Sequence, residues 1–151
     1  MGNSCKELTG VTFILVRPDG KMLLQLRDEK LKYYPNTWCF PGEGREGDKE
    51  IAEIAKRGVR EEFGVELPED ACVFIGVNHL PHISQDVGVV ICKIEDNQIP
   101  ELREGKAIRW MSVCELEKIK LGFEQNKFLL LVRKKLEEFA GVRRKSQWAP
   151  L

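Results

Sequence analysis

Residues 38–65, WCFPGEGREGDKEIAEIAKRGVREEFGV, decide the fold. Their second half carries apolar residues at helical spacing, namely Ile51, Ile54, Ala55 and Val59. Asp48 is a suitable N-cap for such a helix, and Gly64 is a suitable C-cap. We therefore predict a helix over residues 49–63 that packs one face on a core. The glycines within residues 42–47 predict a flexible loop that leads into this helix.

The acidic residues of this helix form a pattern of their own. Glu50, Glu53, Arg57 and Glu61 follow one another at spacings of three, four and four, which places them along one face. A solvated surface of ion pairs would explain that row. The adjacent Glu61 and Glu62, however, lie near the negative end of the helix dipole, where anions are disfavoured unless a cation binds. Because Mg²⁺ prefers carboxylate oxygens, the pair predicts a divalent metal site.

The rest of the chain alternates between strand-like and helix-like segments. Residues 8–16 and 22–26 are apolar and flank the turn sequence Arg17-Pro18-Asp19-Gly20, which predicts a hairpin. Further strands are predicted at 71–77, 87–94 and 107–111, and helices at 114–119 and 127–139. Because strands and helices intermix, we predict one α/β (α+β) domain over residues 1–140, followed by a basic tail, 141–151.

The composition excludes several classes of protein. The 151 residues include 24 basic and 24 acidic side chains, so no net field attracts a long nucleic acid or an anionic membrane. Five cysteines without a CxxC pair argue against a disulfide framework and a zinc site. No apolar stretch approaches the roughly 20 residues that span a membrane. We expect a cytoplasmic protein without a membrane partner, and a homodimer is left open.

One part of the sequence resembles a known family. Residues 57–65, RGVREEFGV, differ at one position from the second half of the Nudix box, G-x5-E-x7-R-E-U-x-E-E-x-G-U, where U is aliphatic. Residues 38–42, WCFPG, resemble the W-x-F-P-G entry to that box. The segments 23–27, 104–105 and 109–112 follow in the order found in MutT-like members. The resemblance covers about 120 residues.

This resemblance implies a fold, a reaction and a cofactor. The expected fold is a Nudix-type α/β/α sandwich with a mixed sheet. The expected reaction is hydrolysis of the diphosphate bond in a small-molecule nucleoside diphosphate derivative, either a nucleoside triphosphate or a nucleoside diphosphate linked to another group. Mg²⁺ or Mn²⁺ would neutralise the phosphates and activate the attacking water.

The box is degenerate in this chain. Counted without gaps from the helix, its first glycine falls on Glu43, its isolated glutamate on Lys49, and the glutamate after the arginine on Gly58. A shift of the loop by one residue recovers Gly44 and Glu50. No shift restores a glutamate at position 58, because that position lies inside the helix between matching neighbours.

Gly58 has two interpretations. It lies three and four residues before Glu61 and Glu62, so the lost carboxylate would belong to the same metal-binding patch. In that case Gly58→Glu should strengthen metal binding and raise hydrolysis. Alternatively, a neighbouring group packs closely into the space that a side chain would fill. The missing glutamate also raises an alternative function, a catalytically impaired Nudix-fold module that binds a nucleotide or a protein partner.

The resemblance also assigns roles to individual residues. It implies that Glu61 and Glu62 bind metal, together with the backbone carbonyl near Gly42. Glu104 is expected to act as a second metal ligand or as the base that activates water. Glu61 is expected to be a catalytic residue as well as a metal ligand. Arg57 is expected to orient the acidic row.

Four residues are candidates for substrate contact. Arg27 could reach a phosphate, although an exposed arginine at a strand end is common. Asn126 aligns with a position that, in MutT-like members, hydrogen-bonds the edge of a purine base. It could equally be the N-cap of the following helix. Trp38 could stack on a base or pack under its loop. Glu43, at the position of the first box glycine, is the fourth candidate.

Four further polar residues have weaker claims. Glu46 and Glu50 are reserve carboxylates that could approach the metal, but pairing with Arg57 is the simpler expectation. His79 and His82 share a loop and could contact substrate.

Overall fold

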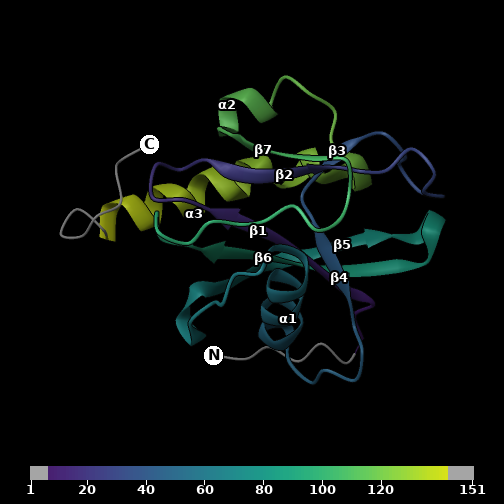
Figure 1. Cartoon of the computed structure of the whole chain (residues 1–151), viewed down its shortest axis with the longest axis horizontal. Helices are drawn as coiled ribbons and strands as arrows, with labels where there is room; N and C mark the ends of the chain where they lie inside the picture. The colour runs from purple at the N-terminus through teal and green to yellow at the C-terminus, as the bar shows by residue number, and fades with distance from the viewer. Residues whose placement is uncertain (1–6, 143–151) are drawn as a thin grey trace.

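The structure is a computed structural model that describes residues 7–142 (Figure 1). The elements in chain order are β1 (Gly10–Val16), β2 (Met22–Leu26), β3 (Trp38–Cys39), β4 (Gly42–Gly44), α1 (Ile51–Phe63), η1 (Glu69–Ala71), β5 (Cys72–Leu80), η2 (Pro81–Ile83), β6 (Gln85–Lys93), β7 (Ala107–Met111), α2 (Val113–Leu116), η3 (Gly122–Phe128) and α3 (Leu129–Val142). The η segments are short 3₁₀ helices.

The strands form one mixed sheet. Its order is β3-β2-β1-β6-β5, with β4 paired to β1 and β7 paired to β2. β1 and β6 run parallel over the whole length of β1, whereas the other pairs are antiparallel. The predicted mixed sheet and α+β class are therefore confirmed.

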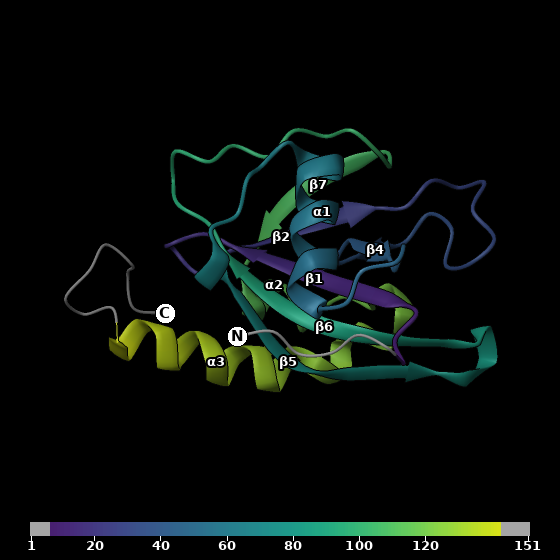
Figure 2. The same ribbon diagram turned by 90° about the horizontal axis from the view of Figure 1, so that it is seen from below.

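β1 contributes to two cores because its side chains alternate between the faces of the sheet. Val11, Phe13 and Leu15 pack with α1 on one face. Ile14 and Val16 pack on the other face with residues of α2 and α3. Figure 1 shows α1 and α3 on different sides of β1 and β6, and Figure 2 shows α1 lying across the strands. The result is the predicted three-layer sandwich.

β4 lies unusually close to β1. A Cβ atom at Gly10 would stand 2.4 Å from the Glu43 carbonyl oxygen, and one at Gly42 would stand 2.7 Å from the Val11 carbonyl oxygen. Both positions therefore require glycine for the two backbones to pair. Part of the stretch predicted to be a flexible loop is thus a strand, and its pairing fixes the position of Glu43 opposite Val11.

The N-terminus of α1 differs from the prediction, whereas its C-terminus does not. Glu50 is the N-cap and makes no side-chain capping bond. Asp48 is not the cap, because its carboxylate accepts hydrogen bonds from Arg57 and from the Glu46 amide. Gly64 ends the helix in the left-handed conformation with φ of 70°, as predicted.

The start of α3 also differs from the prediction. The helix begins at Leu129 after the 3₁₀ segment η3, and Asn126 does not cap it. The Asn126 side chain instead accepts a hydrogen bond from the Leu121 amide and donates one to the Ile119 carbonyl. Its amide therefore holds the turn between α2 and η3.

Three expectations concern the chain as a whole. Within residues 7–142, no helix combines the length and the apolar character needed to cross a bilayer. Cys39, Cys92 and Cys114 are free thiols, and the Sγ atoms of Cys72 and Cys92 lie 3.9 Å apart. Most of the predicted tail, residues 143–151, lies outside the described residues.

Candidate active site

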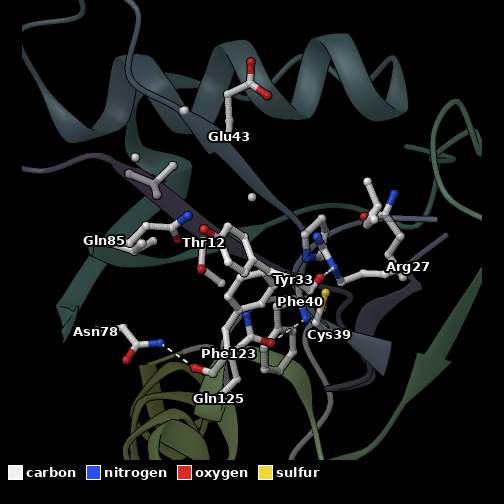
Figure 3. Close-up of a pocket in the computed structure, with 18 of the residues that line it drawn as sticks. Thr12, Arg27, Tyr33, Cys39, Phe40, Glu43, Asn78, Gln85, Phe123 and Gln125 are labelled. Carbon is white, nitrogen blue, oxygen red and sulfur yellow. Dashed lines mark hydrogen bonds between the residues drawn. The ribbon is translucent and has the colours of Figure 1, made fainter. Parts of the chain in front are cut away.

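A pocket of about 580 Å³ opens between α1, the strands around β1, and η3. Glu43, Glu62 and Glu104 line one part of it, which we name the acidic end. Asn78, Phe123 and Gln125 line another part, which we name the amide end. Figure 3 shows Glu43 beside a helix, far from the group formed by Asn78, Phe123 and Gln125. The pocket is therefore chemically different at its two ends.

Glu62 is the most confined carboxylate of the acidic end. The residue is only 6% exposed, and its Oε2 atom is buried without a hydrogen-bond partner. Burial raises the pKa of Glu62 to about 8, and the charges of Glu104 and Glu43 add to that shift. Ionisation of a buried carboxyl without a partner is costly, so a cation bound here would stabilise the charged form of Glu62.

Glu43 brings a second carboxylate to the same place. Burial raises the pKa of Glu43 to about 7, a hydrogen bond to Glu61 adds to the effect, and the charge of Arg57 opposes it. Arg57 Nη1 donates to Glu43 Oε2 at 2.5 Å. Glu61 is therefore close enough to add to the raised pKa values of Glu43 and Glu62, and Glu104 to that of Glu62.

These residues suit a divalent cation of the hard, oxygen-binding type. Glu62 offers an unpartnered oxygen, and the neighbouring carboxylates offer further ones. In residues 7–142, however, no three Cys, His, Asp or Glu side chains are placed so that they could hold a metal ion by themselves. A cation at the acidic end would thus also need a backbone carbonyl or water, as Mg²⁺ sites usually do. Gly42 lines the pocket beside these carboxylates.

Arg57 joins α1 to the loop that precedes it. Its Nη2 atom donates to Asp48 Oδ2 and to the Gly44 carbonyl, both at 2.7 Å. Its Nη1 atom donates to Glu46 at 3.1 Å and lies 3.9 Å from Glu61. The predicted pairing of Glu46 with Arg57 is confirmed. The guanidinium fork uses several donors at once, which gives the loop a fixed position on the helix.

Gly58 faces β4 and β1. A Cβ atom there would lie 2.7 Å from Glu43 Cβ and 2.7 Å from Phe13 Cε1, both closer than real contacts allow. The packing interpretation of Gly58 is therefore correct. The expectation that Gly58→Glu alone would restore a ligand is wrong, because the space for its side chain is already filled.

The amide end is built from β5 and η3. Asn78 is 1% exposed, and its Nδ2 donates to the Phe123 carbonyl at 2.8 Å, while its Oδ1 has no partner. Gln125 accepts from the Phe40 amide at 2.8 Å and donates to the Phe40 carbonyl at 3.3 Å. Asn78 Oδ1 and Glu62 Oε2 are the buried side-chain polar atoms left unpaired in the described part of the chain, and both residues line this pocket.

The structure brings two of the four substrate candidates to the pocket. Glu43 and Arg27 line it, and the Arg27 guanidinium lies 4.8 Å from the centre of the Phe123 ring. Trp38 instead packs against the core beneath α2 and α3. Asn126 lines a separate surface cavity. The substrate-contact predictions for Trp38 and Asn126 are therefore not supported.

The remaining polar candidates lie outside the pocket. His79 hydrogen-bonds Asp86 at 2.7 Å, and His82 hydrogen-bonds the Tyr34 hydroxyl at 3.0 Å. The sequence prediction missed Asn78, Phe123 and Gln125. The one available signal was a pair of polar residues, Asn78-His79, within an otherwise apolar strand segment.

Several solved structures share this fold. MutT, from a structural comparison of Aliivibrio salmonicida and Vibrio cholerae, matches with a TM-score of 0.69 at 19% identity, over 85% of this chain and 98% of that chain. A Caenorhabditis elegans Ap4A hydrolase matches with a TM-score of 0.66 at 16% identity, over 87% and 98%. The NUDIX domain of Shewanella oneidensis NrtR, in complex with ADP ribose, has a TM-score of 0.66 at 16% identity, over 85% and 88%.

Sequence comparison identifies the family. No curated protein has significant sequence similarity to the chain. A family model described as the NUDIX domain, however, matches residues 6–135, which is most of the 151 residues. That match, together with the three-layer fold and the acidic helix, leads to one conclusion. The chain belongs to the NUDIX family.

Proposed function

We propose that the chain is a Mg²⁺- or Mn²⁺-dependent hydrolase that cleaves the diphosphate bond of a nucleoside diphosphate derivative. The observation that carries this proposal is the pocket with an unpaired buried carboxylate oxygen at one end and an unpaired buried amide oxygen at the other. Its acidic end suits a cation that would carry the phosphates, and its amide end suits a base. The Ap4A hydrolase and the NUDIX domain solved with ADP ribose, which share the fold, are named for nucleotide ligands.

The acidic end would carry out the reaction. Glu61, Glu62, Glu104 and the carbonyl near Gly42 would hold the cation. When bound, the cation neutralises phosphate charge and lowers the pKa of the attacking water. As an alternative to holding the cation, Glu104 would accept a proton from the attacking water; it lines the pocket and lies close enough to raise the pKa of Glu62. Arg57 keeps the acidic row oriented through its bonds to the loop.

The amide end would hold the nucleoside. The Phe123 ring offers a stacking surface, and the Asn78 Oδ1 atom offers an acceptor for an amino group on the base. Arg27 lies at the same pocket and would meet a phosphate between the two ends.

A panel assay tests the proposal. Nucleoside triphosphates, dinucleoside polyphosphates and nucleoside diphosphate sugars are incubated with Mg²⁺ or Mn²⁺, and the phosphate-containing products are identified. Glu62→Gln should lower both metal affinity and turnover by about tenfold or more, because it replaces a metal-binding oxygen. A folded Glu62→Gln variant with wild-type turnover would remove this helix from the chemistry.

A nucleotide-binding or protein-binding module without hydrolytic activity is the second candidate. The absence of a carboxylate at Gly58 favours it. Metal titration separates the two functions: nucleotide binding that is unaffected by metal, without product formation, supports the module, whereas metal binding coupled to turnover supports the enzyme.

A further inference from the structure

The space beside Gly58 is occupied by the side chain of Glu43. A Cβ atom at position 58 would lie 2.7 Å from Glu43 Cβ and 3.2 Å from Glu43 Cγ. The Cβ and Cγ atoms of Glu43, which we name its aliphatic stem, therefore run where a side chain from the helix would begin. Two such stems cannot occupy this space together.

The carboxylate at the end of that stem reaches the acidic row of α1. Its Oε2 atom accepts from Arg57 Nη1, and its charge acts on both Glu61 and Glu62. The side chain is 18% exposed, in contrast to 67% for Glu46, the neighbouring partner of Arg57. The Glu43 side chain thus faces inward beside the acidic residues of α1, although Glu43 itself belongs to a strand.

The backbone of β4 holds Glu43 in this position. Glu43 pairs with Val11 of β1, and the neighbouring Gly42 pairs with Thr12. The close approach of the two strands, which Gly10 and Gly42 permit, leaves the backbone little freedom to move. A side chain on such a strand is more rigidly placed than one on a loop.

We propose that Glu43, from β4, supplies the metal-binding carboxylate that α1 lacks at position 58. The inference rests on the proposed function, since it assigns a ligand to the same cation. Its independent support is the buried Oε2 atom of Glu62, which is unpartnered and borders the same pocket. In the ungapped count of the box, glycine is expected at 43 and glutamate at 58. The chain carries the two residue types in exchanged positions.

Titration of the protein with Mn²⁺, followed by the electron paramagnetic resonance signal of the free ion, tests this inference without any substrate. Glu43→Gln keeps the aliphatic stem and should weaken Mn²⁺ binding by about tenfold or more. Glu46→Gln is the matched control, because it removes another carboxylate partner of Arg57 but one that does not line the pocket. Its Mn²⁺ affinity should stay within about twofold of the wild type, the range expected when an exposed side chain outside the pocket is changed.

The exchanged double variant gives the stricter test. Gly58→Glu alone should lower the melting temperature, because its stem meets that of Glu43. Combined with Glu43→Gly, it should regain Mn²⁺ binding and part of the melting temperature, because the contact with the Phe13 ring remains. If the double variant does not fold, the Mn²⁺ affinities of Glu43→Gln and Glu46→Gln decide whether Glu43 is a metal ligand.

Several outcomes would count against the inference in different ways. Wild-type Mn²⁺ affinity in Glu43→Gln, or equal losses in Glu43→Gln and Glu46→Gln, would overturn it. A loss of binding in Glu62→Gln with none in Glu43→Gln would overturn it while leaving the proposed function standing. A wild-type chain that binds no Mn²⁺ at millimolar concentration would overturn both.

Discussion

At the scale of single residues, helix propensity and packing have opposite effects on stability when a side chain is added at Gly58. Alanine is favoured over glycine by about 1 kcal/mol inside a helix. At position 58, however, its Cβ atom would press on Glu43 and on the fully buried Phe13. Overpacking of this kind typically costs about 1–3 kcal/mol. The packing cost should therefore exceed the propensity gain.

We predict that Gly58→Ala lowers the free energy of unfolding by about 1–2 kcal/mol, as measured by urea denaturation. Gly44→Ala is the control, because a Cβ atom there would meet nothing within 4 Å. That variant should stay within about 0.5 kcal/mol of the wild type. A more stable Gly58→Ala protein would show that the contacts around position 58 relax easily.

Glu104 offers a second prediction at this scale. Its backbone carbonyl accepts a hydrogen bond from Gln25 at 2.9 Å, so the loop is held independently of the glutamate side chain. Glu104→Gln should therefore leave the loop in place and remove only the charge. If this carboxylate is the base, kcat should fall by about a hundredfold or more while KM changes little. Steady-state kinetics measures kcat and KM separately, and a change confined to KM would refute the assignment of Glu104 as the base.

At the scale of elements, Arg57 connects α1 to β4 and to the loop between them. Lysine has a single ammonium group and cannot reproduce the fork that contacts Gly44 and Asp48 together. Arg57→Lys should therefore speed amide hydrogen exchange in residues 44–48 and weaken Mn²⁺ binding. Arg60→Lys, on the exposed side of the same helix, should change neither quantity. Unchanged exchange in Arg57→Lys would mean that the loop is held by its own backbone.

The elements also show which features could be predicted from the sequence. α1 and β7 have local patterns, apolar spacing and flanking turns, that specify them without the rest of the chain. β4 was missed because its glycines resemble a loop, and only pairing with β1 makes it a strand. The cap rule is local and selects Asp48, whereas the partner of Asp48 in the structure is Arg57, nine residues away.

The same distinction applies to the candidate site. The acidic end was predictable because most of its carboxylates belong to one continuous motif. The amide end was not, because Asn78 and Phe123 lie 45 residues apart and meet only when η3 packs against β5. A polar residue in a strand carries no local sign of the cavity that it will line.

At the scale of the whole molecule, the acidic end should make stability depend on pH. The pKa of Glu62 is raised to about 8, whereas an unfolded glutamate titrates near 4.3. Between these values the folded chain retains a proton that the unfolded chain has lost. The stability of the metal-free protein must therefore fall as the pH rises through this window. Glu43, with a pKa raised to about 7, adds to the fall over the lower part of the window.

We predict that, in the presence of a chelator, the protein is less stable at pH 8.5 than at pH 6 by on the order of 1–3 kcal/mol. Millimolar Mg²⁺ should reduce this difference, because a bound cation favours the ionised carboxylates. Glu62→Gln should remove most of it, since the amide does not titrate. Urea unfolding at both pH values measures the effect, and a pH-independent metal-free protein would contradict it.

The shared space of Glu43 and Gly58 also constrains how this sequence can evolve. Glutamate at both positions would overfill the space, and glycine at both would leave a void and remove the carboxylate. Each single substitution should therefore be harmful, whereas the two together relieve the overlap between positions 43 and 58 and leave only the contact with Phe13. A mutational scan that changes one residue at a time would record both positions as intolerant. Only a library that varies them jointly would measure how far the two residue types can exchange.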